Sequence, residues 1–317
     1  MLLKRHIMMM PTTSASPENF EPALCPLTDM GVIEVTGDDA EGFLNGQLSH
    51  DVRSRLPLRA TLSAWLDARG RVLALFRAIR TGDHWLLLTR GAEVEALIRR
   101  LRMFVLRADV QLCNQSSRWQ AAAALGGIEP WLESRSIALG AGTGDVATAN
   151  GALFIRVGPQ LVYLVSAGEA PWDWTGGNPS GTEESAALEE IRLGLVNLSP
   201  QIAGRYTAHM LNLDRLGAVA FDKGCYPGQE VVARTENLGT VKRRVFRYSG
   251  ELEHEPTVGT ALLDSGGSQV GEVVRAVRVG ESRVELLAVV RIDSATGNLT
   301  CAIEPGSALT RESLPGE

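Results

Sequence analysis

The sequence predicts an α+β protein with a separate all-β domain toward its C-terminal end. Three observations support this prediction: a length of 317 residues with 44% hydrophobic residues, mixed strand and helix patterns through the first part of the chain, and only β patterns from about residue 240 to 309. A chain of this length exceeds the usual size of one hydrophobic core, so we expect two or three packed domains.

The N-terminal block is expected to open with a strand and a helix. Residues 31–35 have a strand pattern, and Thr36 is the expected N-cap of a helix that runs to about Leu48. Helical spacing then places Gln47 and Asp51 beside the C-terminal end of that helix.

The rest of the mixed region alternates strand patterns with two further helices. The turn 67–70 ends in Gly70, which can take a positive φ between two strands. Residues 168–185 hold so many proline and glycine residues that they predict a linker. The expected strands are 61–66, 71–79, 85–88, 110–112, 153–157 and 161–165, and the expected helices are 93–105 and 183–195.

The two ends of the chain differ in character. Residues 1–23 are predicted to form a disordered tail, because Pro11 interrupts the only apolar run near the N-terminus. Short strands separated by Gly, Asp and Ser favour a small barrel or sandwich at the other end. These strands are expected at 241–248, 261–263, 270–279 and 283–292.

Composition excludes several classes of function. The net charge of -6 and pI near 5.5 argue against direct nucleic-acid binding, which needs many clustered cations. No run approaches the roughly 18 apolar residues of a membrane span. The four cysteines have neither the short spacing of a metal site nor the density of a disulfide framework, which fits a cytoplasmic protein. They are Cys25, Cys113, Cys225 and Cys301.

The most informative segment is the loop from Lys223 to Glu230. Its residues 226–229, Tyr-Pro-Gly-Gln, have proline and glycine at the two central positions of a type II turn. Such a turn is rigid, so it can hold Cys225 before it and Gln229 after it in fixed geometry.

Cys225 has two interpretations. In an extended strand Lys223 and Cys225 would share a face, and the ammonium group would favour a nucleophilic thiolate. Alternatively, Cys225 is a small buried core residue, which is common for free cysteine.

Glu230 and Arg234 also have two interpretations. They are four residues apart, so they could form a helical ion pair worth roughly 0.3 to 0.5 kcal/mol if exposed. Alternatively, Glu230 or Gln229 would hydrogen-bond the edge of a heterocycle, and Arg234 would bind a carboxylate tail.

Several segments together resemble one known family, YgfZ. The most specific match is Lys223-Gly224-Cys225-Tyr226-Pro227-Gly228-Gln229-Glu230-Val231-Val232-Ala233-Arg234, and the resemblance extends from about Leu27 to Leu309. The other matching segments are 211–214, 217–221, 43–47 with Asp51, and 190–192 with Gly194.

The resemblance implies a GcvT/YgfZ-like folate-binding fold. Residues 24–237 would form two intertwined α+β subdomains and 238–311 a C-terminal β-barrel, as in the aminomethyltransferase of the glycine cleavage system. By the same resemblance, Cys225 and Lys223 would be the catalytic residues. The residues expected to bind the cofactor are Tyr226, Gly228, Gln229, Glu230, Arg234, Gln47, Asp51, Glu190 and Arg192.

The function implied is that of an accessory protein that binds tetrahydrofolate or a related folate. It would support iron–sulfur cluster assembly or repair, including iron–sulfur enzymes that modify tRNA, through transient contacts with those proteins. An alternative is a folate-dependent aminomethyl transferase or demethylase, and another is a purely structural interaction protein. Aminomethyl transfer is disfavoured because residues 71–75 lack the aspartate of the transferase, although Asp67 lies nearby.

Overall fold

The computed structural model describes residues 21–53, 58–168, 171, 173 and 179–317 of the chain. The predicted tail lies outside the described residues up to position 20, and so does part of the predicted linker. Within the described residues no helix is long and apolar enough to cross a membrane.

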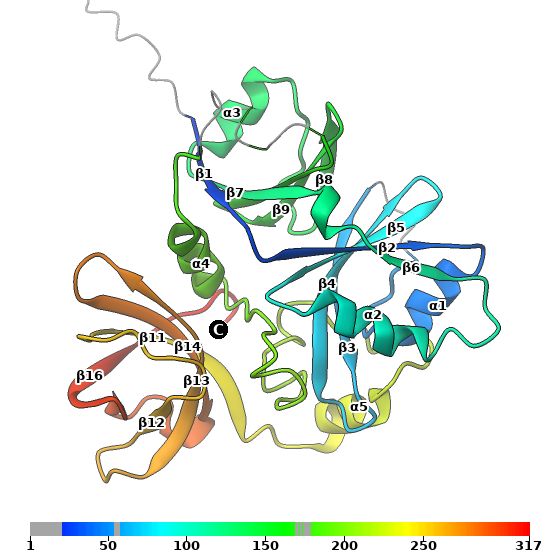
Figure 1. The fold of residues 1–317 in the computed structure, drawn as a ribbon. Helices are drawn as coiled ribbons and strands as arrows, with labels where there is room; N and C mark the ends of the chain where they lie inside the picture. Colours follow the sequence, from blue (N-terminus) through cyan, green and yellow to red (C-terminus); the bar gives the residue numbers. More distant parts are fainter. Residues whose placement is uncertain (1–20, 54–57, 169–170, 172, 174–178) are drawn as a thin grey trace, which may run out of the picture.

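Two five-stranded antiparallel sheets and one barrel make up the molecule (Figure 1). The first sheet has the order β3-β4-β5-β2-β6, and the second has the order β1-β7-β10-β9-β8. The first consists of β3 (Ala60–Leu66), β4 (Val72–Thr81), β5 (His84–Arg90), β2 (Met30–Thr36) and β6 (Gln111–Asn114). The second consists of β1 (Ala23–Pro26), β7 (Gln120–Leu125), β10 (Leu161–Ser166), β9 (Ala152–Gly158) and β8 (Val146–Ala149).

The chain passes between the two sheets more than once. Strand β1 belongs to the second sheet, β2 begins the first, and the segment after β6 returns to the second. The two sheets are therefore intertwined, as the resemblance implied.

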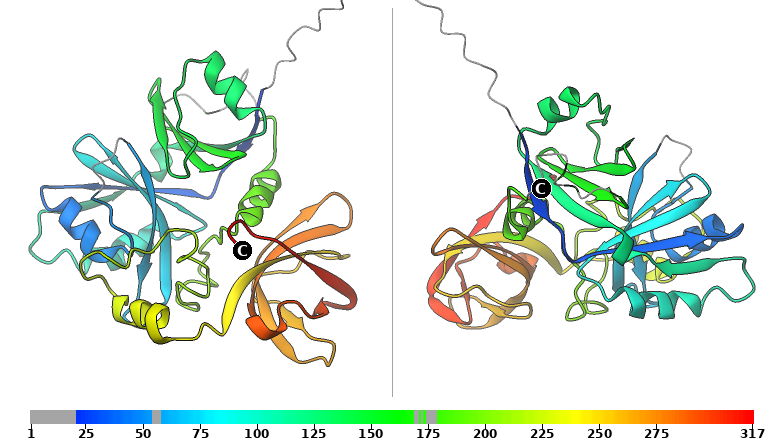
Figure 2. Two further views of the ribbon diagram at one scale, coloured as in Figure 1. Left: turned by 180° about the vertical axis from the view of Figure 1, so that it is seen from behind. Right: turned by 45° about the horizontal axis from the view of Figure 1, so that its top comes forward.

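Helices α1, α2 and α3 cover faces of these sheets, whereas α4 lies against the barrel and α5 precedes it in the chain. Helices α1 (Ala40–Gln47) and α2 (Val94–Arg102) pack on the first sheet, where Leu44 and Ile98 join a core with Phe76. Helix α3 (Ile128–Ser134) packs on the second sheet. Helix α4 (Glu183–Arg192) contacts the barrel strands β13 and β14, and α5 (Gln229–Leu238) directly precedes the barrel (Figure 2).

The C-terminal strands close into a six-stranded barrel, which confirms the predicted all-β domain. Closure leaves no free sheet edge, because β11 pairs with both β14 and β16. Its strands are β11 (Arg243–Glu251), β14 (Arg283–Arg291), β13 (Gln269–Val279), β12 (Ala261–Leu263), β15 (Leu299–Cys301) and β16 (Glu304–Glu312).

Three predicted helix boundaries are wrong, one of them the end of α4, which lies at Arg192 instead of Leu195. Thr36 ends β2 and does not cap a helix, because Gly37 turns the chain at φ 111° and α1 begins only at Ala40. Helix α2 ends at Arg102 instead of Val105, and turns follow in which Leu106 has φ 49°.

Several elements were missed by the sequence analysis. Strand β7 contains the run Ala121–Ala124, and a run of alanine shows no alternation and favours no strand. Strand β16 has Pro305 and Gly306 near its start, which are typical of turns. Helix α5 was also missed, because its start follows the predicted turn at Gly228. The other missed elements, β1, β8, α3 and β15, are too short for a clear period.

Candidate functional site

A cavity lies between the first sheet, strand β10 and the segment after α4. It is lined by Leu62 and Leu75 of the first sheet, Tyr163 of β10, and residues 195–198. It offers about 40 Å³ to the centres of water molecules, which is room for a few waters. A larger ligand would need the lining side chains to separate.

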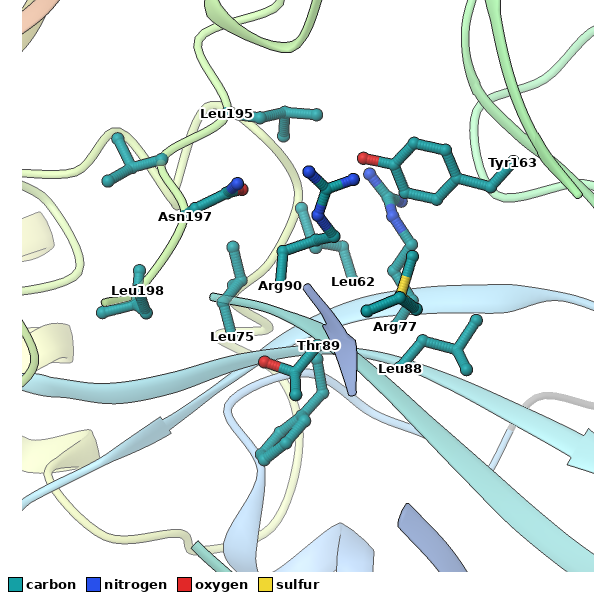
Figure 3. A pocket seen from close by; sticks show the side chains of 13 residues that line it. Leu62, Leu75, Arg77, Leu88, Thr89, Arg90, Tyr163, Leu195, Asn197 and Leu198 are labelled. Atoms are coloured by element: carbon teal, nitrogen blue, oxygen red, sulfur yellow. The ribbon is translucent and has the colours of Figure 1, made fainter. Parts of the chain in front are cut away.

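Polar ends gather on one side of this otherwise apolar cavity. Figure 3 shows the guanidinium groups of Arg77 and Arg90 turned toward the hydroxyl of Tyr163, with Asn197 across the cavity. Strand alternation explains the position of Arg77, because Phe76 and Ala78 belong to the core under α1 and α2 while Leu75 and Arg77 alternate with them.

Glu190 of α4 is the centre of the buried network beside the cavity. This carboxylate is 0% exposed and accepts hydrogen bonds from Tyr163 Oη and Arg275 Nη2. Arg90 Nη1 lies 3.3 Å from it and Arg90 Nε lies 2.6 Å from Asp29. Burial acts to raise the pKa of Glu190, but the guanidinium groups of Arg275 and Arg90 hold it below its usual value.

Arg77 differs from these arginines because no carboxylate pairs with it among the described residues. The residue is 6% exposed, and its Nη1 atom has no hydrogen-bond partner in the described part of the chain. Its guanidinium lies 5.7 Å from the ring centre of Tyr163, and burial lowers its pKa. Thr89 Oγ1 on the neighbouring strand is also buried and unpaired. Buried polar atoms usually have partners, so Arg77 Nη1 and Thr89 Oγ1 have unused hydrogen-bonding capacity at the cavity.

The loop 223–230 forms a second, separate group of predicted site residues. The predicted type II turn is confirmed: Gly228 has φ 78° and ψ -1°, and Gln229 N donates to Tyr226 O over 3.2 Å. The turn packs on the β3–β4 turn, since a Cβ on Gly228 would meet Asp67 O at 2.5 Å.

Lys223 fixes the start of the loop to the end of α1. Its Nζ donates to the carbonyl oxygens of Asn45, Leu48 and His50 over 2.6, 2.7 and 3.1 Å. Carbonyl groups at a helix C-terminus lack intrahelical donors and attract a cation. Burial lowers the pKa of Lys223 to about 8, although Asp51 opposes this shift.

The predicted strand through Lys223 and Cys225 is wrong. The segment contains bends and irregular backbone, and Lys223 is buried while Cys225 is exposed. The two side chains therefore do not share an environment, because Lys223 is held by the helix end and Gly224 lets the chain turn outward. The buried-core interpretation of Cys225 is also wrong, since its thiol is exposed.

Tyr226 and Gln229 anchor the loop after Cys225. Tyr226 is buried in the core shared with the barrel, and its ring centre lies 5.2 Å from Lys223 Nζ. Gln229 Nε2 donates to Lys223 O over 3.3 Å. The loop thus presents the Cys225 thiol to solvent from a backbone fixed on both sides.

The remaining predicted residues lie in three different places. Gln47 Oε1 accepts from Trp65 Nε1 over 3.3 Å, and Asp51 pairs with Arg53, whose hydrogen bond lowers the pKa of Asp51 to about 2. Glu230 and Arg234 are exposed on α5 and form no ion pair with each other in the described structure. Arg192 pairs with Glu189 and with Glu285 of the barrel, and so joins α4 to β14.

None of the residues predicted for cofactor binding lines the cavity. Glu190 comes nearest, through its contact with Tyr163. The sequence analysis missed Arg77, Thr89, Arg90 and Tyr163 as site residues. One signal was available, because Arg77 is a charged residue within the apolar strand pattern of residues 72–79.

Two further carboxylate sites have structural roles. Asp67 Oδ1 accepts from the backbone N–H groups of Arg69 and Arg71, so this carboxylate stabilises the turn. His209, Asp214 and Glu236 approach one another, but Arg244 already binds both oxygens of Asp214. Asp67 thus stabilises the β3–β4 turn, and Asp214 pairs with Arg244.

Comparisons with known proteins agree with this architecture. The chain is 27% identical to the tRNA-modifying protein YgfZ of Colwellia psychrerythraea, over 96% of this chain and 96% of that protein. It is 26% identical to the protein of the same name from Escherichia coli O157:H7, over 96% of this chain and 95% of that protein. No family model matches the chain.

A solved structure shows the same fold. The glycine cleavage system aminomethyltransferase T from Bartonella henselae superposes with a TM-score of 0.74 at 16% identity, over 93% of this chain and 86% of that chain. At this low identity the likeness concerns the fold alone. The predicted resemblance to the YgfZ family is therefore confirmed along nearly the whole chain, on the fold of a glycine-cleavage aminomethyltransferase.

Proposed function

We propose that this protein binds tetrahydrofolate or a related folate in the central cavity. As a cytoplasmic accessory protein of the YgfZ type, it then supports iron–sulfur enzymes, including those that modify tRNA. The observation that carries the proposal is the buried, unpaired Arg77 beside Thr89 in an apolar cavity. The name of the relatives, tRNA-modifying protein YgfZ, supports the part concerning tRNA.

A reduced pterin ring suits the chemistry of the groups around the cavity, and the lining side chains must separate to admit it. Leu62, Leu75 and Leu88 offer apolar contacts for the faces of the ring, and polar ring atoms would accept from Arg77 and pair with Thr89. When bound, a folate supplies a one-carbon carrier. No carboxylate lines the cavity among the described residues, which favours binding over aminomethyl transfer.

Cys225 has a separate part in this proposal. Its exposed thiol lies on an anchored loop, where another protein can reach it. There the thiol would take part in redox chemistry, handle sulfur, or contact an iron–sulfur cluster transiently. One thiolate cannot hold a cluster that takes four ligands, so a partner must provide the others. Lys223 and Gln229 position the loop, and Glu230 and Arg234 lie exposed beside it.

Calorimetric titration with tetrahydrofolate tests the binding step. We expect saturable binding by the wild type and by Cys225→Ser, and binding at least about tenfold weaker by Arg77→Met, a loss of about 1.4 kcal/mol. Arg118→Met, which removes an exposed arginine outside the cavity, is the matched control. Circular dichroism would verify that each variant is folded. Absence of saturable binding by the folded wild type would overturn the folate proposal.

A further inference from the structure

An exposed patch of arginines and apolar side chains lies at the C-terminal end of α2. Residues 99–107, Arg-Arg-Leu-Arg-Met-Phe-Val-Leu-Arg, contain four arginines and no acidic residue. Met103, Phe104 and Leu106 are 64%, 46% and 88% exposed. We call residues 99–107 the α2 patch. Large apolar side chains gathered on a surface mark an interaction site more often than a single exposed one does.

Leu106 is not explained by the stability of this chain. Its side chain is 88% exposed and so gains almost no stability from burial. Its backbone φ of 49° lies in the left-handed region that bulky residues avoid. Glycine or asparagine would fit this backbone at lower cost. A contact with another molecule would explain a leucine at this position.

The α2 patch is connected through Trp65 to the end of α1, where Lys223 holds the loop that presents Cys225. The Phe104 ring meets the edge of Trp65 at 6.1 Å between centres, and Arg100 lies 5.4 Å from the Trp65 ring. Trp65 is hydrogen-bonded to Gln47 at the end of α1, where Lys223 is also bound.

We propose that the α2 patch docks a protein whose surface combines acidic and apolar side chains, and thereby brings that protein to Cys225. Charge supports this occupant: Arg99 and Arg107 are exposed and form no ion pair within the described part of the chain. Arginine, methionine and aromatic residues are also the types enriched in protein interfaces.

RNA fits the same patch less well. Single-stranded bases stack on aromatic rings and arginines, which Phe104 and the patch arginines offer, but the more exposed Met103 and Leu106 have no such group and the net charge of the chain is -6. The proposal concerns a surface remote from the cavity, so it does not depend on folate binding.

Photo-crosslinking on the full chain tests the identity of the occupant. Phe104 is replaced by p-benzoylphenylalanine in cells that produce the protein, and Ile303, which is 49% exposed on the barrel, is replaced in the control. We expect an adduct from position 104, and not from 303, that resists ribonuclease and is degraded by protease. An adduct cut by ribonuclease, an adduct with a second copy of this chain, or no adduct would each overturn the proposal.

Titration with the crosslinked protein, identified by mass spectrometry and purified, then tests the chemistry. Leu106→Gly removes the apolar contact without cost to the fold, and Arg99→Glu with Arg107→Glu reverses the charge. We expect each variant to bind at least about tenfold more weakly, and wild-type binding to weaken with added salt. Ile303→Ser should bind as the wild type does. Unchanged binding by the charge-reversed variant would overturn the acidic occupant.

Discussion

At the scale of single residues, Lys223 illustrates how one buried cation fixes a loop. Replacing it with methionine leaves three carbonyl oxygens at the end of α1 without their donor. We expect Lys223→Met to lower the free energy of unfolding by about 1 to 3 kcal/mol, measured by urea denaturation. Lys242→Met, at an exposed position, is the matched control and should change it by less than about 0.5 kcal/mol.

The same residue makes stability depend on pH. Its pKa is about 8 in the folded protein, against an ordinary lysine value of 10.5 in the unfolded chain, so the unfolded chain binds more protons between these values. The penalty of burying the ammonium group is present below pH 8 and disappears as pH rises toward 10.5. The unfolding free energy of the wild type, relative to Lys223→Met, should therefore increase across this window. Paired urea titrations at several pH values measure it, and a constant difference would refute the assignment.

Replacing Cys225 should change the function of the protein but not its stability. Its exposed thiol contributes little to packing, so Cys225→Ser should change the free energy of unfolding by less than about 0.5 kcal/mol. On the proposed function, the same change should abolish support of iron–sulfur enzymes in complemented cells. Cys113 is also exposed and lies outside the loop, so Cys113→Ser should keep full activity. Equal activity of the two variants would exclude a chemical role for Cys225.

At the scale of elements, the packing of two turns determines where the loop lies. Gly228 has a positive φ, and a Cβ there would meet Asp67 O at 2.5 Å and Gly70 N at 3.0 Å. Gly228→Ala should therefore destabilise the protein by more than about 1 kcal/mol in chemical denaturation. A Cβ on Gly224 would meet nothing within 4 Å, so Gly224→Ala is the matched control. Similar losses for both would show that the turn contact is unimportant.

At the scale of the whole molecule, Glu190 links three parts of the fold. This carboxylate contacts Arg90 of the first sheet, Tyr163 of the second and Arg275 of the barrel. Glu190→Gln removes the charge between two buried guanidinium groups, and we expect it to cost about 3 to 5 kcal/mol. Differential scanning calorimetry should show a lower Tm, while the half-buried neighbour Glu189→Gln changes it little. A Tm unchanged by Glu190→Gln would argue against this network.

The sequence by itself determined the features that depend on local conformation and periodicity. It predicts the alternating patterns of β11 to β14, the turn before β4, and the type II turn at Gly228, because proline and glycine restrict φ without help from distant residues. The motif around Cys225 also pointed to the family resemblance that the comparisons confirm.

Only the tertiary structure decided which distant groups meet. Lys223 and Leu48 are 175 positions apart, and Arg275 and Glu190 are 85 apart, so no local period encodes either contact. For the same reason the cavity around Arg77 was missed: it forms where two sheets and a loop converge. Side-chain chemistry can be read along a chain, but burial and partners arise from packing.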